Sequence, residues 1–136
     1  MSDKSFSLVV HGAPFTSQAS YTALQFAKAC IDAGHSLYRV FFYQDGVLNG
    51  NSLLSPPQDE LNQHASWAAL QANTDCELTI CIAAAARRGM IDESEAQRHE
   101  HEHFTIPKGF ELAGLGQLVD ACIHSDRVIN FGAARG

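Results

Sequence analysis

Hydrophobic residues along the chain fall into runs with two kinds of spacing, separated by short polar or glycine-rich segments. Compact runs rich in β-branched and aromatic residues are typical of buried strands, whereas apolar residues three or four positions apart are typical of a helix face. The compact runs predict four strands, at residues 5–10, 37–43, 78–82 and 127–131. A weaker fifth strand is expected near residues 110–112.

Helical spacing predicts three longer helices, at residues 17–33, 58–73 and 115–123. Asp92 and Glu95 have the spacing of a capping box, which predicts the start of a shorter helix. In the second long helix we expect a buried stripe beside Trp67, itself a core or subunit-interface residue: Leu61, Ala65, Ala68, Ala69 and Ala72.

Strands that alternate with helices predict a single α/β domain over residues 1–136, with a doubly wound, mainly parallel sheet of four to five strands and helices on both faces. Ligands bind such sheets beyond the carboxyl ends of the strands, near the point where strand order reverses. Three segments qualify: the loop after Val10, the turn-rich loop 44–57, and the turn after Cys81. His11 begins the first of them and could take part in proton transfer. That loop has no glycine pattern for nucleotide phosphates, and no cofactor is expected.

Charge and composition narrow the class of function. The 136 residues are 46% hydrophobic, enough for a core without disulfides or metal, and the formal net charge is −6. Direct nucleic-acid binding is disfavoured, because it normally needs a basic surface that neutralises phosphates. The first residues lack the features of a signal peptide, and no apolar run reaches the roughly 20 residues that span a bilayer. A cytoplasmic protein that binds no membrane is therefore expected.

The four cysteines are expected to be thiols, and no two have the CxxC spacing of a zinc or redox motif. Cys30 and Cys122 are expected to pack on the buried sides of helices. Cys76 precedes a strand and can be exposed, but its acidic and amide neighbours are a poor environment for a thiolate.

Cys81 is the strongest candidate for chemistry. It lies near the end of the strand 78–82 and is followed by an alanine-rich turn that contains Arg87 and Arg88. Unpaired backbone N–H groups at the start of a helix and the two guanidinium groups would stabilise a thiolate, which is the nucleophilic form of cysteine. A cysteine between two isoleucines can equally be an ordinary core residue, so both interpretations stay open at this point.

His99, His101 and His103 alternate with glutamates. On a strand these three imidazoles would share one face and could bind zinc or nickel. The segment is polar and irregular, however, and no fourth ligand is marked. We therefore expect a solvated loop and no metal site.

Two segments carry a resemblance to a known family: Val-Phe-Phe-Tyr-Gln-Asp-Gly-Val at 40–47 and Ile-Cys-Ile-Ala-Ala-Ala-Ala-Arg-Arg-Gly at 80–89. With shorter matches from residue 7 to residue 131, the sequence resembles the DsrE/TusD family of small sulfur-carrier proteins, most closely its TusD branch. The histidine-rich segment near His101 and the residues after Phe131 depart from the family pattern.

The resemblance implies a flavodoxin-like α/β subunit whose cysteine, matching Cys81, carries a persulfide. In the TusD branch such a subunit joins TusB-like and TusC-like subunits in a hetero-oligomer, expected to be a heterohexamer. It accepts sulfur from a TusA-like donor and passes it to a TusE-like acceptor, for 2-thiouridine formation in tRNA wobble bases. The matching cysteine is thus the expected catalytic residue, with Arg87 and Arg88 as anion stabilisers.

Other functions compete with this one. The DsrE branch shares the cysteine motif and implies sulfur trafficking in sulfur oxidation. A non-catalytic assembly subunit with a buried thiol is a further alternative. For any assembly, the strand and loop around residues 41–54 are expected to supply exposed apolar residues to an interface: Val47, Leu48, Leu53 and Leu54.

Overall fold

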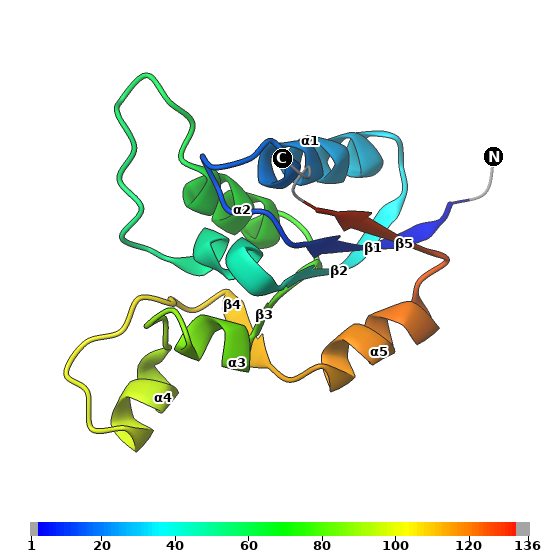
Figure 1. Ribbon diagram of the computed structural model, residues 1–136. Helices are drawn as coiled ribbons and strands as arrows, with labels where there is room; N and C mark the ends of the chain where they lie inside the picture. The colour runs from blue at the N-terminus through cyan, green and yellow to red at the C-terminus, as the bar shows by residue number, and fades with distance from the viewer. Residues whose placement is uncertain (1–2, 133–136) are drawn as a thin grey trace.

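The computed structural model describes residues 3–132, which form a five-stranded, fully parallel sheet with helices on both faces (Figure 1). The spatial order of the strands is β4-β3-β2-β1-β5. The predicted flavodoxin-like α/β fold class is confirmed, including the fifth strand that the sequence marked only weakly. The strands are β1 (Ser5–Val10), β2 (Ser36–Phe42), β3 (Glu77–Cys81), β4 (Phe110–Ala113) and β5 (Arg127–Phe131).

The order of the strands reverses once. From β1 the chain adds β2, β3 and β4 on one side, and it then returns to place β5 on the other side of β1. Because crossovers between parallel strands are right-handed, the two directions put their helices on opposite faces. Accordingly α1 (Ala19–Asp32) and α2 (Gln63–Ala72) cover one face and α5 (Gly116–His124) the other (Figure 1). Within the described range, every helix is too short or too polar to cross a bilayer.

Three short helices lie near the carboxyl ends of the strands. They are η1 (Gln44–Gly50, a 3-10 helix), α3 (Ile82–Ala86) and α4 (Glu93–Arg98). The Asp92 carboxylate accepts a hydrogen bond from the Glu95 backbone N–H at 2.9 Å, so the predicted start of α4 is confirmed. The prediction of an irregular loop over 44–57 was wrong for its first half, because η1 occupies it.

The central strands are buried on both sides, which explains their nearly continuous apolar sequence. Phe41 and Phe42 of β2 and Ile80 of β3 have no exposed surface. Trp67 of α2 is also fully buried and packs edge-on against Phe42, with ring centroids 5.3 Å apart. Trp67 is therefore a core residue, one of the two roles expected for it.

The start and the buried face of α2 differ from the prediction. The helix begins at Gln63 rather than near residue 58, because the Asn62 side chain accepts from the Ala65 N–H at 3.0 Å and caps it there. Its buried residues are Gln63, His64 and Trp67. The residues predicted to form the buried stripe are instead half-buried or exposed: Leu61, Ala65, Ala68, Ala69 and Ala72. Periodicity cannot find a buried face whose polar side chains are satisfied by hydrogen bonds.

Candidate active site

Cys81 occupies the junction between a strand and a helix. It is the last residue of β3 and the N-cap residue of α3, with φ −61° and ψ 116°. Its neighbour across the sheet is Ala113, the last residue of β4. The first backbone N–H groups of α3 follow directly, and the Cys81 side chain makes no capping hydrogen bond to them. The position predicted for Cys81, at the carboxyl edge of the sheet, is confirmed.

The thiol is covered in the isolated chain. Cys81 exposes 4% of its surface, although Ile82 next to it is half-buried and Ala83 is exposed. The sequence left both a reactive and a packed cysteine open, and the burial agrees with the packed one. Nucleophilic attack on another protein's sulfur requires contact, so any such chemistry needs the segment around Cys81 to open.

Arg87 and Arg88 lie at the far end of α3 from Cys81. A helix of this length spans about 7.5 Å at 1.5 Å per residue. Arg87 is the C-cap residue and is exposed. Arg88 directs Nε and Nη2 at Asp45 Oδ1, both at 2.9 Å, and donates from Nη1 to the Ala84 carbonyl at 2.8 Å. Their part in stabilising an anion stays a prediction.

Sequence reasoning missed Asp45. It treated this residue only as part of a turn, although Asp45 lies two residues after the end of the predicted strand 37–43. The structure instead makes Asp45 the acidic partner of Arg88, so that η1 and α3 are joined by an ion pair.

Burial of the other cysteines differs from the prediction in one case, that of Cys122. Cys30 is buried, as expected, and desolvation raises the pKa of its thiol. Cys76, which had been open to exposure, is only 2% exposed, and burial raises its pKa to about 12. Cys122 was expected to be buried but is exposed, because it lies on the outer side of α5.

His11 is separated from Cys81 by two strand spacings of the sheet. It follows β1, which lies two strands from β3, or about 10 Å at 4.8 Å between neighbouring strands. Its Nε2 lies 3.3 Å from Asn130 Oδ1 of β5, beside the point where strand order reverses. The structure therefore brings His11 to the reversal point but does not bring it to Cys81.

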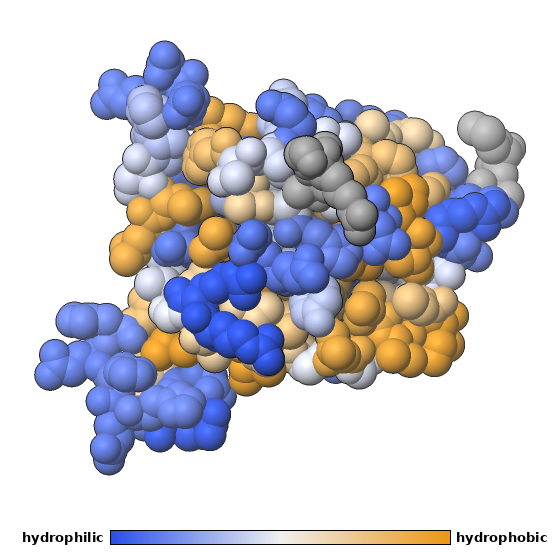
Figure 2. Space-filling model, in the orientation of Figure 1, coloured by the Kyte–Doolittle hydropathy of each residue, from blue (hydrophilic) through white to orange (hydrophobic). Residues whose placement is uncertain are grey.

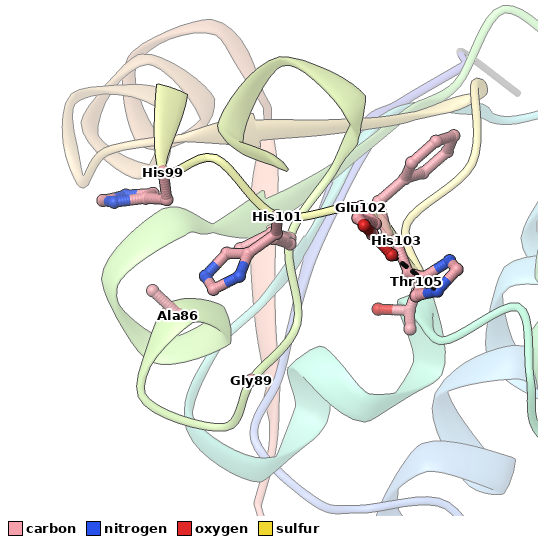
Figure 3. Close-up of a pocket in the computed structure, with 9 residues that line it drawn as sticks. Ala86, Gly89, His99, His101, Glu102, His103 and Thr105 are labelled. Atoms are coloured by element: carbon pink, nitrogen blue, oxygen red, sulfur yellow. Dashed lines mark ion pairs between the residues drawn. The ribbon is translucent and has the colours of Figure 1, made fainter. Parts of the chain in front are cut away.

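The histidine segment lines a cavity of about 510 Å³ together with the end of α3. His99, His101 and His103 point in different directions around it (Figure 3). His99 contacts Glu95 at 3.2 Å, whereas His103 is 93% exposed beside Glu102. Among the residues described, no three His, Cys, Asp or Glu side chains gather closely enough to hold a metal ion.

The apolar interface expected around residues 41–54 is mostly absent from the surface. Val47 has no exposed surface, and Leu48 and Leu54 are half-buried. The phenylalanines of β2 belong to the core as well. Only Leu53, at 68% exposure, matches the prediction, because η1 folds its apolar side chains inward.

The fold and the site define the class of this protein: a parallel α/β domain with a cysteine at a strand–helix junction on the carboxyl edge of its sheet. The DsrE/DsrF-like family model matches residues 4–131, and the chain belongs to this family. DsrE of Allochromatium vinosum is 45% identical over 127 residues, covering 93% of this chain and 98% of the relative. A sulfurtransferase TusD homologue of Aliivibrio fischeri is 47% identical over 126 residues, covering 93% and 97%.

A sulfurtransferase TusD homologue of Vibrio vulnificus is 45% identical over 131 residues, covering 96% of this chain and all of the relative. Among solved structures, the YchN protein from E. coli superposes with a TM-score of 0.75 at 20% identity, covering 94% of this chain and 99% of that one. The YchN similarity supports the fold, and the names of the curated relatives support the prediction of a sulfur-relay sulfurtransferase.

Proposed function

We propose that the protein is a sulfurtransferase that carries a persulfide on Cys81. The observation that supports this most strongly is the position of Cys81 at the β3–α3 junction, in a chain whose relatives are named sulfurtransferases. Of its four cysteines, this is the one that ends a strand on the carboxyl edge where parallel α/β proteins place their sites.

The transfer consists of two displacements without net oxidation. The Cys81 thiolate attacks the outer sulfur of a donor persulfide, a new S–S bond forms, and the donor leaves as a thiolate. An acceptor thiolate then attacks the outer sulfur of the Cys81 persulfide, and the Cys81 thiolate is the leaving group. Proximity of the two sulfurs accounts for most of the rate, because a lower thiol pKa also lowers nucleophilicity. Arg87, exposed at the end of α3, is proposed to stabilise the anionic states, whereas the guanidinium of Arg88 is already engaged by Asp45.

For the wider pathway we propose a cytoplasmic relay from a TusA-like donor to a TusE-like acceptor, ending in 2-thiouridine of tRNA wobble bases. The net charge of −6 suits a subunit that hands sulfur to another protein without holding RNA. Sulfur trafficking of the DsrE type is the second candidate, because the DsrE and TusD relatives are 45% and 47% identical to this chain. Transfer of labelled sulfur to a TusE-like protein, and not to a sulfur-oxidation acceptor, would favour the first.

Assembly with TusB-like and TusC-like subunits, expected as a heterohexamer, is part of the proposal. It is supported by an apolar stripe on the outer side of α5, where orange surface is visible in Figure 2. The stripe consists of Leu115, just before the helix, with Val119, Cys122 and Ile123, spaced to share one helix face and all exposed. A non-catalytic assembly subunit would use the same surface, so the test of function has to follow sulfur itself.

The test is mass spectrometry of the protein after incubation with a low-molecular-weight persulfide. In a Cys122→Ser background, which removes the exposed thiol, we expect the mass of one added sulfur atom, its retention in Cys30→Ser and its loss in Cys81→Ser. Cys30 is a matched control, because it is 5% exposed and Cys81 is 4% exposed. An unreduced gain in Cys81→Ser would place the sulfur elsewhere and favour the assembly subunit.

A further inference from the structure

The helix that follows Cys81 is held mainly by its contacts with η1. Four of the five residues of α3 are alanine, and its buried residues are Ala84 and Ala85. A helix this short is not stable without tertiary contacts. The packing of α3 against η1 therefore decides how firmly the segment after Cys81 is held.

The neighbouring η1 is, by contrast, firmly anchored. The Gly46 N–H donates to the His11 carbonyl at 3.1 Å, and a Cβ at Gly46 would collide with the Val10 carbonyl oxygen. Asn49 is fully buried, accepts from Ser20 Oγ at 2.8 Å and donates to the Gly46 carbonyl at 3.0 Å. η1 is thus held on the carboxyl end of β1 by a close backbone approach and by buried hydrogen bonds.

Arg88 joins α3 to η1. Each of its three guanidinium nitrogens has a partner, two on Asp45 of η1 and one on the Ala84 carbonyl of α3. The carboxylate of Asp45 balances the arginine charge, so Arg88 has little capacity left to act on a distant sulfur. The side chains are 30% and 63% exposed, so the pair lies at the surface.

We propose that Asp45 and Arg88 are positioning residues, which hold α3 against η1 and thereby control access to the Cys81 thiol. This rests on the proposed function, in which Cys81 is the sulfur carrier. The burial of Cys81 is the reason that such control matters, since attack on its sulfur requires the segment to open. The pair acts through the position of α3 and not through charge at the sulfur.

Two variants and their combination test the proposal. In Asp45→Asn, Arg88→Gln and the double variant, we expect hydrogen exchange of the α3 amides and iodoacetamide alkylation of Cys81 to accelerate, each by roughly two- to fivefold. This is the range expected when an exposed ion pair limits a local opening. The double variant should gain no more than either single variant, and Arg88→Lys, which keeps the charge but not the fork, should lie between.

Arg98→Gln is the matched control. It breaks a similar surface pair, with Glu95 at 2.9 Å in α4, and should leave Cys81 and α3 unchanged. Cys30 should be alkylated at the wild-type rate in every variant, because only α3 is expected to open.

Three results would overturn the proposal. One is unchanged exchange of α3 in Asp45→Asn and Arg88→Gln, and another is an unchanged alkylation rate at Cys81. The third is effects of opposite sign in the two variants, which direct electrostatic action of Arg88 on the sulfur would produce. Failure of persulfide loading at Cys81 is a separate result, because hydrogen exchange reports α3 whether or not sulfur is transferred.

Discussion

At the scale of residues, three thiols with nearly equal exposure differ in their surroundings. Cys30, Cys76 and Cys81 expose 5%, 2% and 4% of their surface. Burial raises the pKa of Cys30 and Cys76, which lie away from the carboxyl edge of the sheet, at the end of α1 and ahead of β3. Because the three side chains are almost equally buried, a reactive cysteine among them has to become accessible through local opening of the chain around it.

At the scale of elements, α5 is fastened to the sheet by a charged group inside the structure. Arg39 of β2, 5% exposed, donates to Asp120 Oδ2 at 2.7 Å and to the Gln117 carbonyl at 2.9 Å, and it also pairs with Glu77. Tyr38 donates to the same Asp120 oxygen at 2.6 Å. Hydrogen bonds from Tyr38 and then Arg39 hold the pKa of Asp120 below its usual range.

Asp120→Asn should therefore destabilise the protein more at pH 7 than at pH 3. The lowered pKa of Asp120 in the folded state means that the unfolded state takes up its proton more readily, so this contribution is complete above about pH 5. It is lost as the pH falls through the folded value. Urea unfolding at several pH values measures the difference, and a gap between variant and wild type that does not shrink on acidification would contradict this assignment.

The sequence predicted the elements that have a local pattern and missed contacts between residues far apart in the chain. Strands and helices were found because buried apolar runs and helical spacing leave a local pattern, as in Ser5–Val10. Buried polar contacts leave none. The predicted stripe of α2 failed because Gln63 and His64 are buried and hydrogen-bonded to distant residues, Ser20 and Asn49. The partner of Arg88 was missed because Asp45, although at the surface, lies 43 positions away in the sequence. The place of Cys81 followed from the chain around it, but its burial depends on tertiary packing.

At the scale of the whole molecule, the acidic chain presents the apolar stripe of α5 and places Cys81 at the carboxyl end of an inner strand. The strand order reverses between β1 and β5, so Cys81 on β3 lies two strands from the usual ligand crevice. A small molecule is usually enclosed by the loops around the crevice. A site away from the crevice is better suited to a partner protein that approaches the carboxyl edge of the sheet.

Val119→Lys should prevent the proposed association with TusB-like and TusC-like subunits, because a charge would replace an apolar side chain that is 57% exposed on the α5 stripe. Gln117→Lys is the control, since it adds the same charge to an exposed position on another side of α5. Co-purification and size-exclusion chromatography measure the outcome. Assembly of Val119→Lys to the wild-type extent would remove the α5 stripe from the proposed interface.

The most direct test of the sulfur-carrier account is the rate at which each of the four thiols is alkylated in one native sample, followed by peptide mass spectrometry. Exposed Cys122 should react fast. The account predicts that Cys81 reacts clearly faster than Cys30 and Cys76, despite equal burial, because the segment around it opens. A Cys81 as slow as Cys30 and Cys76 would contradict it and leave an assembly subunit with a packed thiol.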